Sequence, residues 1–423
     1  MSKDSSAKKM DSKTSVSTTT PVPLLDLGPE YDAVGEQIER EIGRVIQSRQ
    51  FVLGPDCQQL EDEMASFCQA QFGIGCASGS DALLLSLMAM GLAPGDEVLV
   101  PSFTFFATAS AVWRLGGKPV FVDIDPVTYN IDPAKIGEAI TERTKAIIPV
   151  HLFGQCADMD RINAIASDRG LHVTEDAAQA IGATYQGRPA GSLGDIGCFS
   201  FYPTKNLGGV GDGGMLTTSD EKLADRLRLL RDHGMQPRYH HAMVGINSRL
   251  DSMQAAALRI KLLYLASWSE QRRSNAANYA ELFEKSGLSD HLRVPATDDA
   301  AGHVWNQFTV QVSHGQRDAL RLYLTAARIG TEIYYPIPLH RQACFASLGY
   351  GEGSLPITEQ AAREVLSLPI YPGLTSQQQV IVVNALAQFF GCQRVSDDLE
   401  SSRARILTMP SRPDDDLPRA KSA

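Results

Sequence analysis

Residues 199–209 read FSFYPTKNLGG, and the rest of the chain is best understood outward from this stretch. Lys205 follows a short aromatic run of strand type and precedes a glycine-rich turn. Because a surface lysine is normally flanked by polar residues, this setting predicts that the Lys205 stem enters a partly buried site. Burial disfavours the ammonium form and lowers the lysine pKa, which makes the amine a nucleophile. A lysine that merely reaches solvent from a strand end is the alternative.

Upstream of this stretch, short apolar strands alternate with helical segments. The expected strands are 98–100, 120–122, 146–150 and 172–174, and helices are expected near 105–115, 133–140 and 159–165. Continuous apolar strands separated by helices predict a mostly parallel sheet covered on both faces, in a large α/β domain. Its ligand should lie at the carboxyl ends of the strands.

A second chemical stretch, Glu175-Asp176-Ala177-Ala178-Gln179, follows the last of these strands. A carboxylate there needs a partner to tolerate burial. If Lys205 holds the aldehyde of pyridoxal phosphate, Asp176 can pair with the protonated ring nitrogen and keep the ring an electron sink. By itself an N-cap at the start of a helix is the commoner role for such an aspartate. Together with Lys205, the cofactor role is favoured.

A third stretch, residues 76–85, reads CASGSDALLL and opens a strongly apolar helix. Ser80 or Asp81 is the expected N-cap of that helix. A helix start presents unpaired N–H groups and the positive end of the helix dipole, so it can bind an anion. A plain capped helix is the alternative for this stretch taken alone.

Residues 209–214 read GVGDGG and formally match the dinucleotide-binding pattern G-x-G-x-x-G. That fingerprint requires a helix after the glycines, but the next residues, 215–218, read as a strand. We therefore predict no dinucleotide site, and a nicotinamide-dependent oxidoreductase stays a weak alternative. The glycines are expected to let backbone pass close to Lys205.

Bulk properties exclude several functional classes. The net charge of −10 argues against nucleic-acid binding, and no apolar run approaches the ~20 residues of a membrane span. The seven cysteines are scattered without metal-ligand spacing, and the adjacent histidines 240 and 241 point apart, so no metal site is expected. Free thiols and the lack of an apolar signal core predict a cytoplasmic protein.

The chain is predicted to divide into four parts. Residues 1–20 and 395–423 are polar and should be disordered. Residues 21–265 should form the large cofactor-binding α/β domain, and 266–394 a smaller α+β domain. In the smaller domain we expect strands at 308–312 and 331–335, with a helix at 317–327 between them.

Seven motifs then carry a resemblance: SGSDALLLSL, GDEVLVPSFTF, AIIPVHLFGQCADMD, EDAAQAIGA, FSFYPTKNLGG, GINSRLDSMQAA and IYYPIPLH. Over residues 24–387 the chain resembles the nucleotide-sugar aminotransferases of the DegT/DnrJ/EryC1/StrS group. The resemblance implies the fold of the type I pyridoxal-phosphate enzymes, which is aspartate aminotransferase-like.

The resemblance also implies roles around the cofactor ring. Lys205 would form the Schiff base with pyridoxal phosphate and move the substrate proton. Asp176 would bind the ring nitrogen, Gln179 the phenolic oxygen, and Phe105 would stack on the ring. Members that dehydrate sugars carry histidine at the position of Lys205. The lysine in this chain therefore implies transamination.

Further implied roles lie at the phosphate. Gly79, Ser80 and Asp81 would bind it through backbone N–H groups and the Ser80 hydroxyl, and Ser200 would add its own hydroxyl. Asn247 matches a residue that reaches the phosphate of the neighbouring subunit. A homodimer with shared active sites is thus expected.

The resemblance is less specific about the identity of the substrate. The motifs look most like the branch that aminates UDP-2-acetamido-2-deoxy-3-oxo-glucuronate with glutamate as donor. There Arg238, from the partner subunit, would meet the sugar carboxylate. Tyr334, expected to bind substrate, departs from that branch, which has histidine there, and residues 204–206 depart too. dTDP-linked 3-keto or 4-keto-6-deoxy sugars stay open, as does a non-catalytic regulator that binds the cofactor.

Overall fold

The computed structural model describes residues 20–296 and 301–396, so the predicted terminal extensions lie almost wholly outside the described residues. At its centre is a seven-stranded sheet. The strand order is β1 (Phe72–Cys76), β9 (Gly214–Thr218), β8 (Ile196–Ser200), β5 (His172–Asp176), β4 (Thr144–Ile147), β2 (Glu97–Pro101) and β3 (Lys118–Val122).

The sheet is mostly parallel, as the sequence predicted. Strands β3, β2, β4, β5 and β8 run parallel to one another, while β9 is antiparallel to both β8 and β1. The glycine-rich turn after Lys205 leads into the antiparallel β9, not into a helix. This matches the context on which a dinucleotide fingerprint was rejected.

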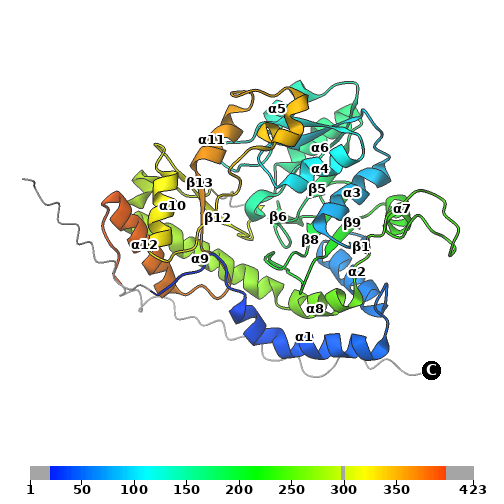
Figure 1. Cartoon of the computed structure of the whole chain (residues 1–423), viewed down its shortest axis with the longest axis horizontal. Coiled ribbons are helices and arrows are strands. Elements are labelled where there is room, and N and C mark those ends of the chain that lie inside the picture. Colours follow the sequence, from blue (N-terminus) through cyan, green and yellow to red (C-terminus); the bar gives the residue numbers. More distant parts are fainter. Residues whose placement is uncertain (1–19, 297–300, 397–423) are drawn as a thin grey trace, which may run out of the picture.

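Helices cover both faces of the sheet (Figure 1). The apolar residues of each helix pack into one of two separate cores, one on each face of the sheet. One face carries α3 (Gly79–Met90), α4 (Phe106–Arg114) and α7 (Glu221–Arg231). The other carries α2 (Pro55–Phe67), α5 (Pro133–Ala139), α6 (Met159–Arg169) and α8 (Ser252–Leu262). Helix α1 (Gly28–Ser48) packs outside α8 through Val34 and Ile38.

The carboxyl edge of the sheet gathers the chemical stretches. Strand β5 ends at Asp176, and its neighbour β8 ends at Ser200, shortly before Lys205. Strand β1 ends at Cys76 and leads directly into α3. Three segments that are distant in sequence therefore meet at one edge, where a parallel sheet places its ligand.

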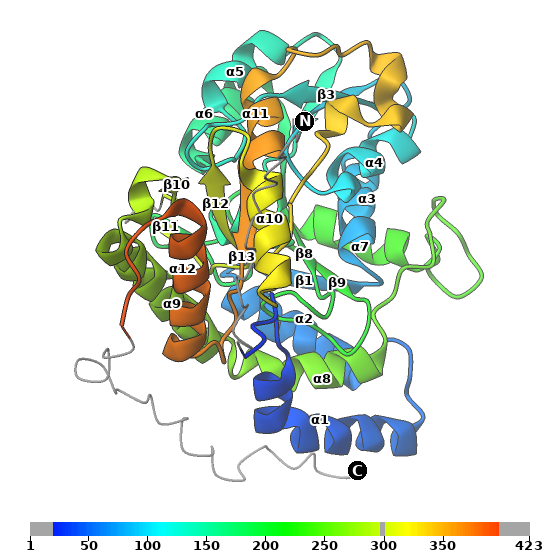
Figure 2. The same ribbon diagram turned by 60° about the vertical axis from the view of Figure 1, so that its left-hand side comes forward.

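The smaller unit is built on a three-stranded antiparallel sheet of order β10 (Leu292–Arg293), β12 (Phe308–Val312) and β13 (Val365–Leu368). Figure 2 shows helices packed beside it. These are α9 (Leu265–Ser286), α10 (Arg317–Ala326), α11 (Pro356–Glu364) and α12 (Ser376–Phe390). The remaining elements are β6 (Thr184–Tyr185), β7 (Arg188–Pro189), β11 (Ala301–Gly302), η1 (Leu152–Gly154), η2 (Leu288–Asp290), η3 (Leu339–Arg341) and η4 (Ala343–Leu348).

The two units are joined by shared apolar packing. Leu265, at the start of α9, is buried in the large-unit core, while Tyr279 and Phe283 further along α9 are buried in the small-unit core. Val22 packs into the same small-unit core and forms backbone hydrogen bonds with residues 328 and 330. The segment before α1 thus lies on the small unit, and α1 itself lies on the large one.

One predicted strand is absent. Residues 331–335 form no strand, and only Glu332 bridges to Ser367 of β13. The apolar and aromatic side chains there mimic a strand pattern. Ile333 and the two tyrosines pack in the same core as Tyr279 and Phe283, to which Phe103 of the large unit also contributes, and the rings of Tyr335 and Phe103 meet edge to face.

Two kinds of feature are missing from the described part of the chain. Among residues 20–296 and 301–396, no helix is both long and apolar enough to cross a bilayer. The same residues include no group of three or more histidine, cysteine, aspartate or glutamate side chains placed to hold a metal ion.

Candidate active site

Lys205 lies in a turn just beyond β8, and neighbouring groups hold the turn. Its backbone N–H donates to the Tyr202 carbonyl at 2.8 Å, and the adjacent Asn206 donates through Nδ2 to the Val304 carbonyl at 2.8 Å. Desolvation lowers the Lys205 pKa to about 8, although the nearby Asp176 carboxylate opposes the shift. A substantial fraction of the amine is therefore neutral near physiological pH, as a nucleophile or base requires.

Asp176 is buried at the end of β5, close enough to Lys205 for the two charges to interact. Thr108 on α4 donates to Asp176 Oδ2 at 2.7 Å, and the Ala178 N–H donates to Oδ1 at 3.2 Å. Burial raises the Asp176 pKa, and these two hydrogen bonds and Lys205 oppose the rise. Asp176 caps no helix, because no helix follows β5 directly. Nothing in the sequence pointed to Thr108.

The start of α3 differs from the predicted cap. Ser78 is the N-cap, and its Oγ accepts the Asp81 N–H at 3.1 Å. Because N-cap side chains bond to the third residue of a helix, the capping residue stands two positions earlier than Ser80. The Asp81 N–H is thus paired within the helix start, in contrast to its predicted contact with a phosphate. The N–H groups of Gly79 and Ser80 lie in the first turn, where a helix offers no intrahelical acceptor.

Gly79 and Ser200 come so close that only glycine fits. A Cβ on Gly79 would lie 2.6 Å from the Ser200 Cβ, and one on Gly214 would lie 2.5 Å from the Ser78 carbonyl carbon. Because these glycines have no side chains, the start of α3 packs against the end of β8 and the start of β9. The predicted phosphate residues Gly79, Ser80 and Ser200 are therefore gathered at one place.

Ser248, which sequence reasoning missed, ties this place to the loop before α8. Its Oγ donates to Asp81 Oδ2 at 2.7 Å and accepts the Ala77 N–H at 3.2 Å. Ser248 directly follows Asn247 in the chain. The loop carrying Asn247 is thus anchored at its base to the start of α3.

Gln179 and Phe105 lie beside a tyrosine that was not singled out. Gln179 Oε1 accepts the Phe153 N–H at 2.7 Å, and its Nε2 donates to the Tyr335 hydroxyl at 3.1 Å. Phe105 precedes α4, remains 57% exposed, and has its ring centroid 6.3 Å from that of Tyr335. An exposed aromatic ring beside buried polar groups can stack on a planar ligand.

Tyr334, the predicted substrate residue, lies beside the Lys205 turn. It lines a small pocket together with Thr204, the residue before Lys205. Burial raises the pKa of the Tyr334 phenol, and the negative charge of Glu332 adds to the rise. The hydroxyl therefore stays protonated and can donate a hydrogen bond to a ligand.

Arg238 and Asn247 are the remaining predicted ligand residues. Both are exposed and belong to the segment between α7 and α8, part of which projects from the body of the molecule (Figures 1 and 2). Asn247 lies at the base of this segment, where it bridges to Asp232 at the end of α7. The Arg238 guanidinium stacks on the ring of Tyr239, 4.9 Å from its centroid. In this chain the Arg238 guanidinium is therefore placed against Tyr239, while Asn247 lies next to the residue that anchors the start of α3.

A second buried carboxylate supports the end of β5. Glu175 accepts three backbone N–H groups of residues 191–194 at 2.7–2.8 Å, and its Oε2 lies 2.9 Å from His151 Nε2. His151 Nδ1 accepts the Ala157 N–H, so Nε2 carries the proton and donates to Glu175. The His151 backbone N–H also donates to the Asp176 carbonyl. These bonds fix the backbone on which Asp176 stands.

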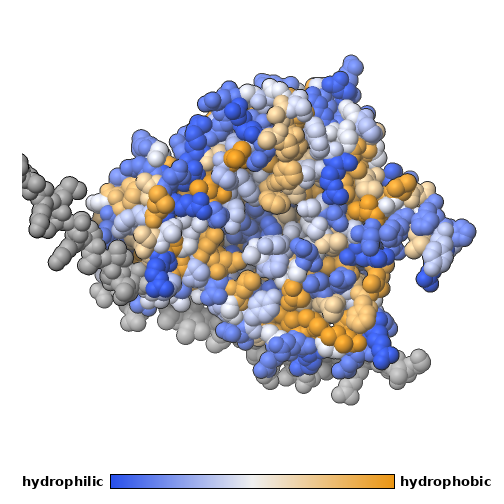
Figure 3. Space-filling view, in the orientation of Figure 1, coloured by the Kyte–Doolittle hydropathy of each residue, from blue (hydrophilic) through white to orange (hydrophobic). Residues whose placement is uncertain are grey.

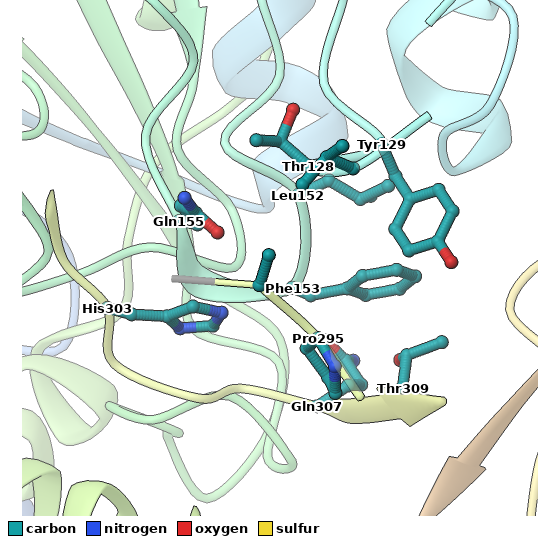
Figure 4. Close-up of a pocket in the computed structure, with 11 residues that line it drawn as sticks. Thr128, Tyr129, Leu152, Phe153, Gln155, Pro295, His303, Gln307 and Thr309 are labelled. Carbon is teal, nitrogen blue, oxygen red and sulfur yellow. The ribbon is translucent and has the colours of Figure 1, made fainter. Parts of the chain in front are cut away.

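Another pocket is too small to be the site. Figure 4 shows it between Phe153 and Tyr129 on one side and His303, Pro295 and Gln307 on the other. Its volume is about 10 Å³, which is the space of about one water molecule. The candidate site stays at the carboxyl edge of the sheet, where the ends of β5 and β8 and the start of α3 meet.

Comparison with known proteins identifies the family. The model of the DegT/DnrJ/EryC1/StrS aminotransferase family matches residues 32–387. The chain belongs to this family. The resemblance inferred from the motifs is therefore confirmed, and so is the α/β fold predicted with it.

Three curated relatives illustrate what this chain is similar to. A "pleiotropic regulatory protein" of Geobacillus stearothermophilus is 51% identical, covering 87% of this chain and 98% of its own. A UDP-N-acetyl-3-dehydro-α-D-glucosamine 3-aminotransferase of Acidithiobacillus ferrooxidans is 48% identical (85% and 95%). The UDP-2-acetamido-2-deoxy-3-oxo-D-glucuronate aminotransferase of Pseudomonas aeruginosa is 44% identical (86% and 99%).

Solved structures share the fold. That of S. venezuelae DesV in complex with a ketimine intermediate is 44% identical with a TM-score of 0.85, covering 89% of this chain and all of that one. That of NtdA from Bacillus subtilis with bound PMP is 34% identical with a TM-score of 0.82 (88% and 86%). The coverage of this chain is wide enough to include both units in each comparison.

Proposed function

We propose that this protein is a pyridoxal-phosphate-dependent aminotransferase that converts a nucleotide-linked keto sugar to an amino sugar, with glutamate as the amino donor. The observation that carries the proposal is the pairing of Lys205, with its pKa lowered to about 8, with the buried carboxylate of Asp176. Desolvated lysines activated in this way are the residues that condense with aldehydes.

The residues present fit this cofactor. A phosphate dianion suits the first-turn N–H groups of Gly79 and Ser80, next to which the Ser200 side chain packs because Gly79 has no Cβ. Asp176 suits a protonated ring nitrogen, because a cation beside it would offset the cost of burying its charge. When bound, pyridoxal phosphate supplies a ring that accepts the electron pair released at the substrate carbon.

The chain's own groups then divide the work of proton transfer. The neutral Nζ of Lys205 takes the α-proton of glutamate and returns a proton to the former carbonyl carbon of the sugar. Thr108 and the Ala178 N–H keep the Asp176 carboxylate aimed, and so hold the proton on the ring nitrogen. Nitrogen balances over two half-reactions, since glutamate leaves as 2-oxoglutarate and the keto sugar leaves as an amine.

The place of the remaining ligand residues supports a homodimer with shared sites. Arg238 and Asn247 are exposed in the segment between α7 and α8, where a neighbouring subunit can receive them. Apolar surface also gathers near α8 and the end of α1 (Figure 3), where Ile46, Val52 and Leu263 are 54%, 52% and 68% exposed. Such a patch favours association with a second copy.

The substrate class rests on the relatives' names. Two of the curated relatives are named for UDP-linked 3-keto sugars, which favours the UDP branch, while a dTDP-linked keto sugar stays the alternative. A relative named as a regulator keeps a non-catalytic role in view. A regulator without catalysis would have no need of Lys205 and Asp176, and both are in place here. Nucleotide sugars are soluble, so the proposed activity is consistent with a cytoplasmic location.

Absorbance spectroscopy tests the proposal. Purified protein with pyridoxal phosphate should show a visible band that glutamate bleaches, and Lys205→Ala should never show that bleaching. Keto sugars of the UDP and dTDP series, added after glutamate, should restore the band only when accepted. A band that glutamate leaves unchanged would refute the aminotransferase assignment.

A further inference from the structure

Outside the site, three buried side chains form a continuous hydrogen-bonded chain. Ser102, just after β2, has its Oγ 2.7 Å from His340 Nδ1, and His340 Nε2 lies 3.2 Å from Glu359 Oε1 on α11. Ser102 is fully buried, and His340 and Glu359 are 2% and 8% exposed. Ser102 belongs to the large unit, His340 to η3 and Glu359 to α11.

The direction of each hydrogen bond follows from the neighbours. Ser102 Oγ already accepts the His340 backbone N–H at 3.1 Å, so its own hydrogen is directed to His340 Nδ1. His340 Nε2 then carries the ring proton and donates to Glu359. Burial alone would raise the Glu359 pKa, but the Gly353 N–H and His340 hold it below its ordinary value. Burial lowers the His340 pKa, which keeps the imidazole neutral.

The trio has the composition of a hydrolase triad but neither its orientation nor its access. In a hydrolase the serine meets Nε2 of the histidine and the carboxylate meets Nδ1, which is the reverse of the order here. A fully buried Ser102 also cannot reach a substrate. The three residues therefore act through what they hold in place.

What they hold is the segment of residues 334–340, which we call the strap. At its far end, the Ser102 backbone carbonyl and Oγ accept the N–H groups of Leu339 and His340. At its near end, the Tyr335 hydroxyl accepts a hydrogen bond from Gln179. Between these anchors, the strap is partly open to solvent, and Ile337 is 49% exposed.

The strap borders the Lys205 turn. Tyr334 and Thr204, the neighbour of Lys205, line one small pocket together with Asn306 and Gln307. A shift of the strap would therefore move Tyr334 relative to Thr204 and the Lys205 turn.

We propose that His340 is a positioning residue, which sets the strap through Ser102 and Glu359 and thereby sets how tightly the keto sugar binds. This inference deepens the proposed function and rests on it for the kinetic readout. Gln179 also has an anchor outside the strap, because its Oε1 accepts the Phe153 N–H. The cofactor side should therefore tolerate a loosened strap better than the sugar side.

Three variants separate the links. Ser102→Ala removes the two hydroxyl bonds to His340 and leaves the backbone bond from the Leu339 N–H. His340→Asn retains an acceptor near the Nδ1 position for Ser102 while losing Glu359, and Glu359→Gln retains an acceptor for His340 Nε2. We expect Ser102→Ala to raise the KM for the keto sugar by ~10-fold with kcat changed less than about threefold, as for loss of one or two hydrogen bonds. The KM of His340→Asn for the keto sugar should lie between those of the other two variants, and the KM of Glu359→Gln should stay within about twofold of wild type.

A second readout needs no cofactor. In the protein freed of pyridoxal phosphate, amide hydrogen exchange in peptides covering residues 334–342 should speed up in Ser102→Ala and not in Glu359→Gln. The positioning role would be overturned if Ser102→Ala left the exchange rate unchanged. It would also be overturned if the variant lowered kcat as much as it raised the KM values for the keto sugar and for glutamate. If wild type itself gave no half-reaction with glutamate, the proposed function would fall, whereas the exchange experiment would still decide the strap.

Discussion

The two halves of the candidate site differ in how complete they are within one chain. Around Lys205 and Asp176, buried donors and acceptors are paired and the two charged groups interact. Arg238 and Asn247, in the segment between α7 and α8, have exposed side chains. The cofactor half is thus preorganised by the fold, while we propose that a second subunit completes the sugar half.

The contrast has a physical cause. A buried carboxylate or amine is costly unless neighbours compensate it, so the fold must supply Thr108 and the Ala178 N–H along with Asp176. An exposed guanidinium is solvated by water and needs no partner until a ligand arrives. Variants in the two halves should therefore fail in different ways.

The largest effect is expected for Lys205→Ala. Loss of the amine removes both the nucleophile and the proton carrier, so turnover should fall by ~10³-fold or more. The check is the rate of 2-oxoglutarate formation, with thermal unfolding measured to show that the fold survives. Turnover near that of wild type would contradict the assignment of Lys205.

Asp176→Asn should come next. The amide keeps the shape of the side chain but cannot hold a protonated ring nitrogen by charge, so the half-reaction with glutamate should slow by ~10²–10³-fold. Stopped-flow absorbance measures this rate. Asp176→Glu serves as the charge-preserving comparison, and equal loss in both variants would point to misplaced geometry and not to lost charge.

Arg238→Ala should weaken binding of the keto sugar without affecting the cofactor half of the site. A lost charge-assisted hydrogen bond costs ~1.5–3 kcal/mol, so the KM for an acidic keto sugar should rise by roughly 10- to 100-fold. The half-reaction with glutamate and the cofactor band should be unchanged. Arg169→Ala, which alters an exposed arginine at the end of α6, is the matched control. A defect in the cofactor band would contradict the division between halves.

Thr108→Val tests the support of Asp176 with a smaller effect. Valine matches threonine in shape but removes the hydroxyl that donates to Oδ2 at 2.7 Å. One such bond contributes ~1–2 kcal/mol, so the affinity for pyridoxal phosphate should fall by about five- to thirtyfold. Equilibrium titration followed by absorbance measures it. Thr309→Val removes an equally buried hydroxyl, bonded to Ser367 in the small unit, and is the control that should leave this affinity unchanged.

The smallest effect concerns pH in the protein without cofactor. The Lys205 pKa lies at about 8 when folded against an ordinary value of 10.5, so between these values the unfolded chain binds more protons. The free energy of unfolding of wild type, relative to Lys205→Met, should therefore rise with pH across that window. Parallel denaturation curves at pH values spanning the two pKa values check this, and a constant difference would mean that Lys205 is not desolvated.

Local sequence was enough to predict that Lys205 and Asp176 are desolvated. An aromatic run before Lys205 and an apolar strand before Asp176 indicate burial, and burial is what perturbs the pKa of each group. Strand–helix alternation predicted the parallel sheet for the same reason, since apolar periodicity reports which faces are covered. The strand expected at 331–335 failed because apolar content alone does not say which partner a segment packs against.

The sequence by itself thus determined the fold class, the family and the burial of Lys205 and Asp176, because each depends on residues adjacent in the chain. Only the tertiary structure decided that Thr108 braces Asp176, that Ser78 and not Ser80 caps α3, and that Ser102 meets His340 from the far end of the chain. Hydrogen bonds between distant segments depend on the packing of whole elements, which no local pattern encodes.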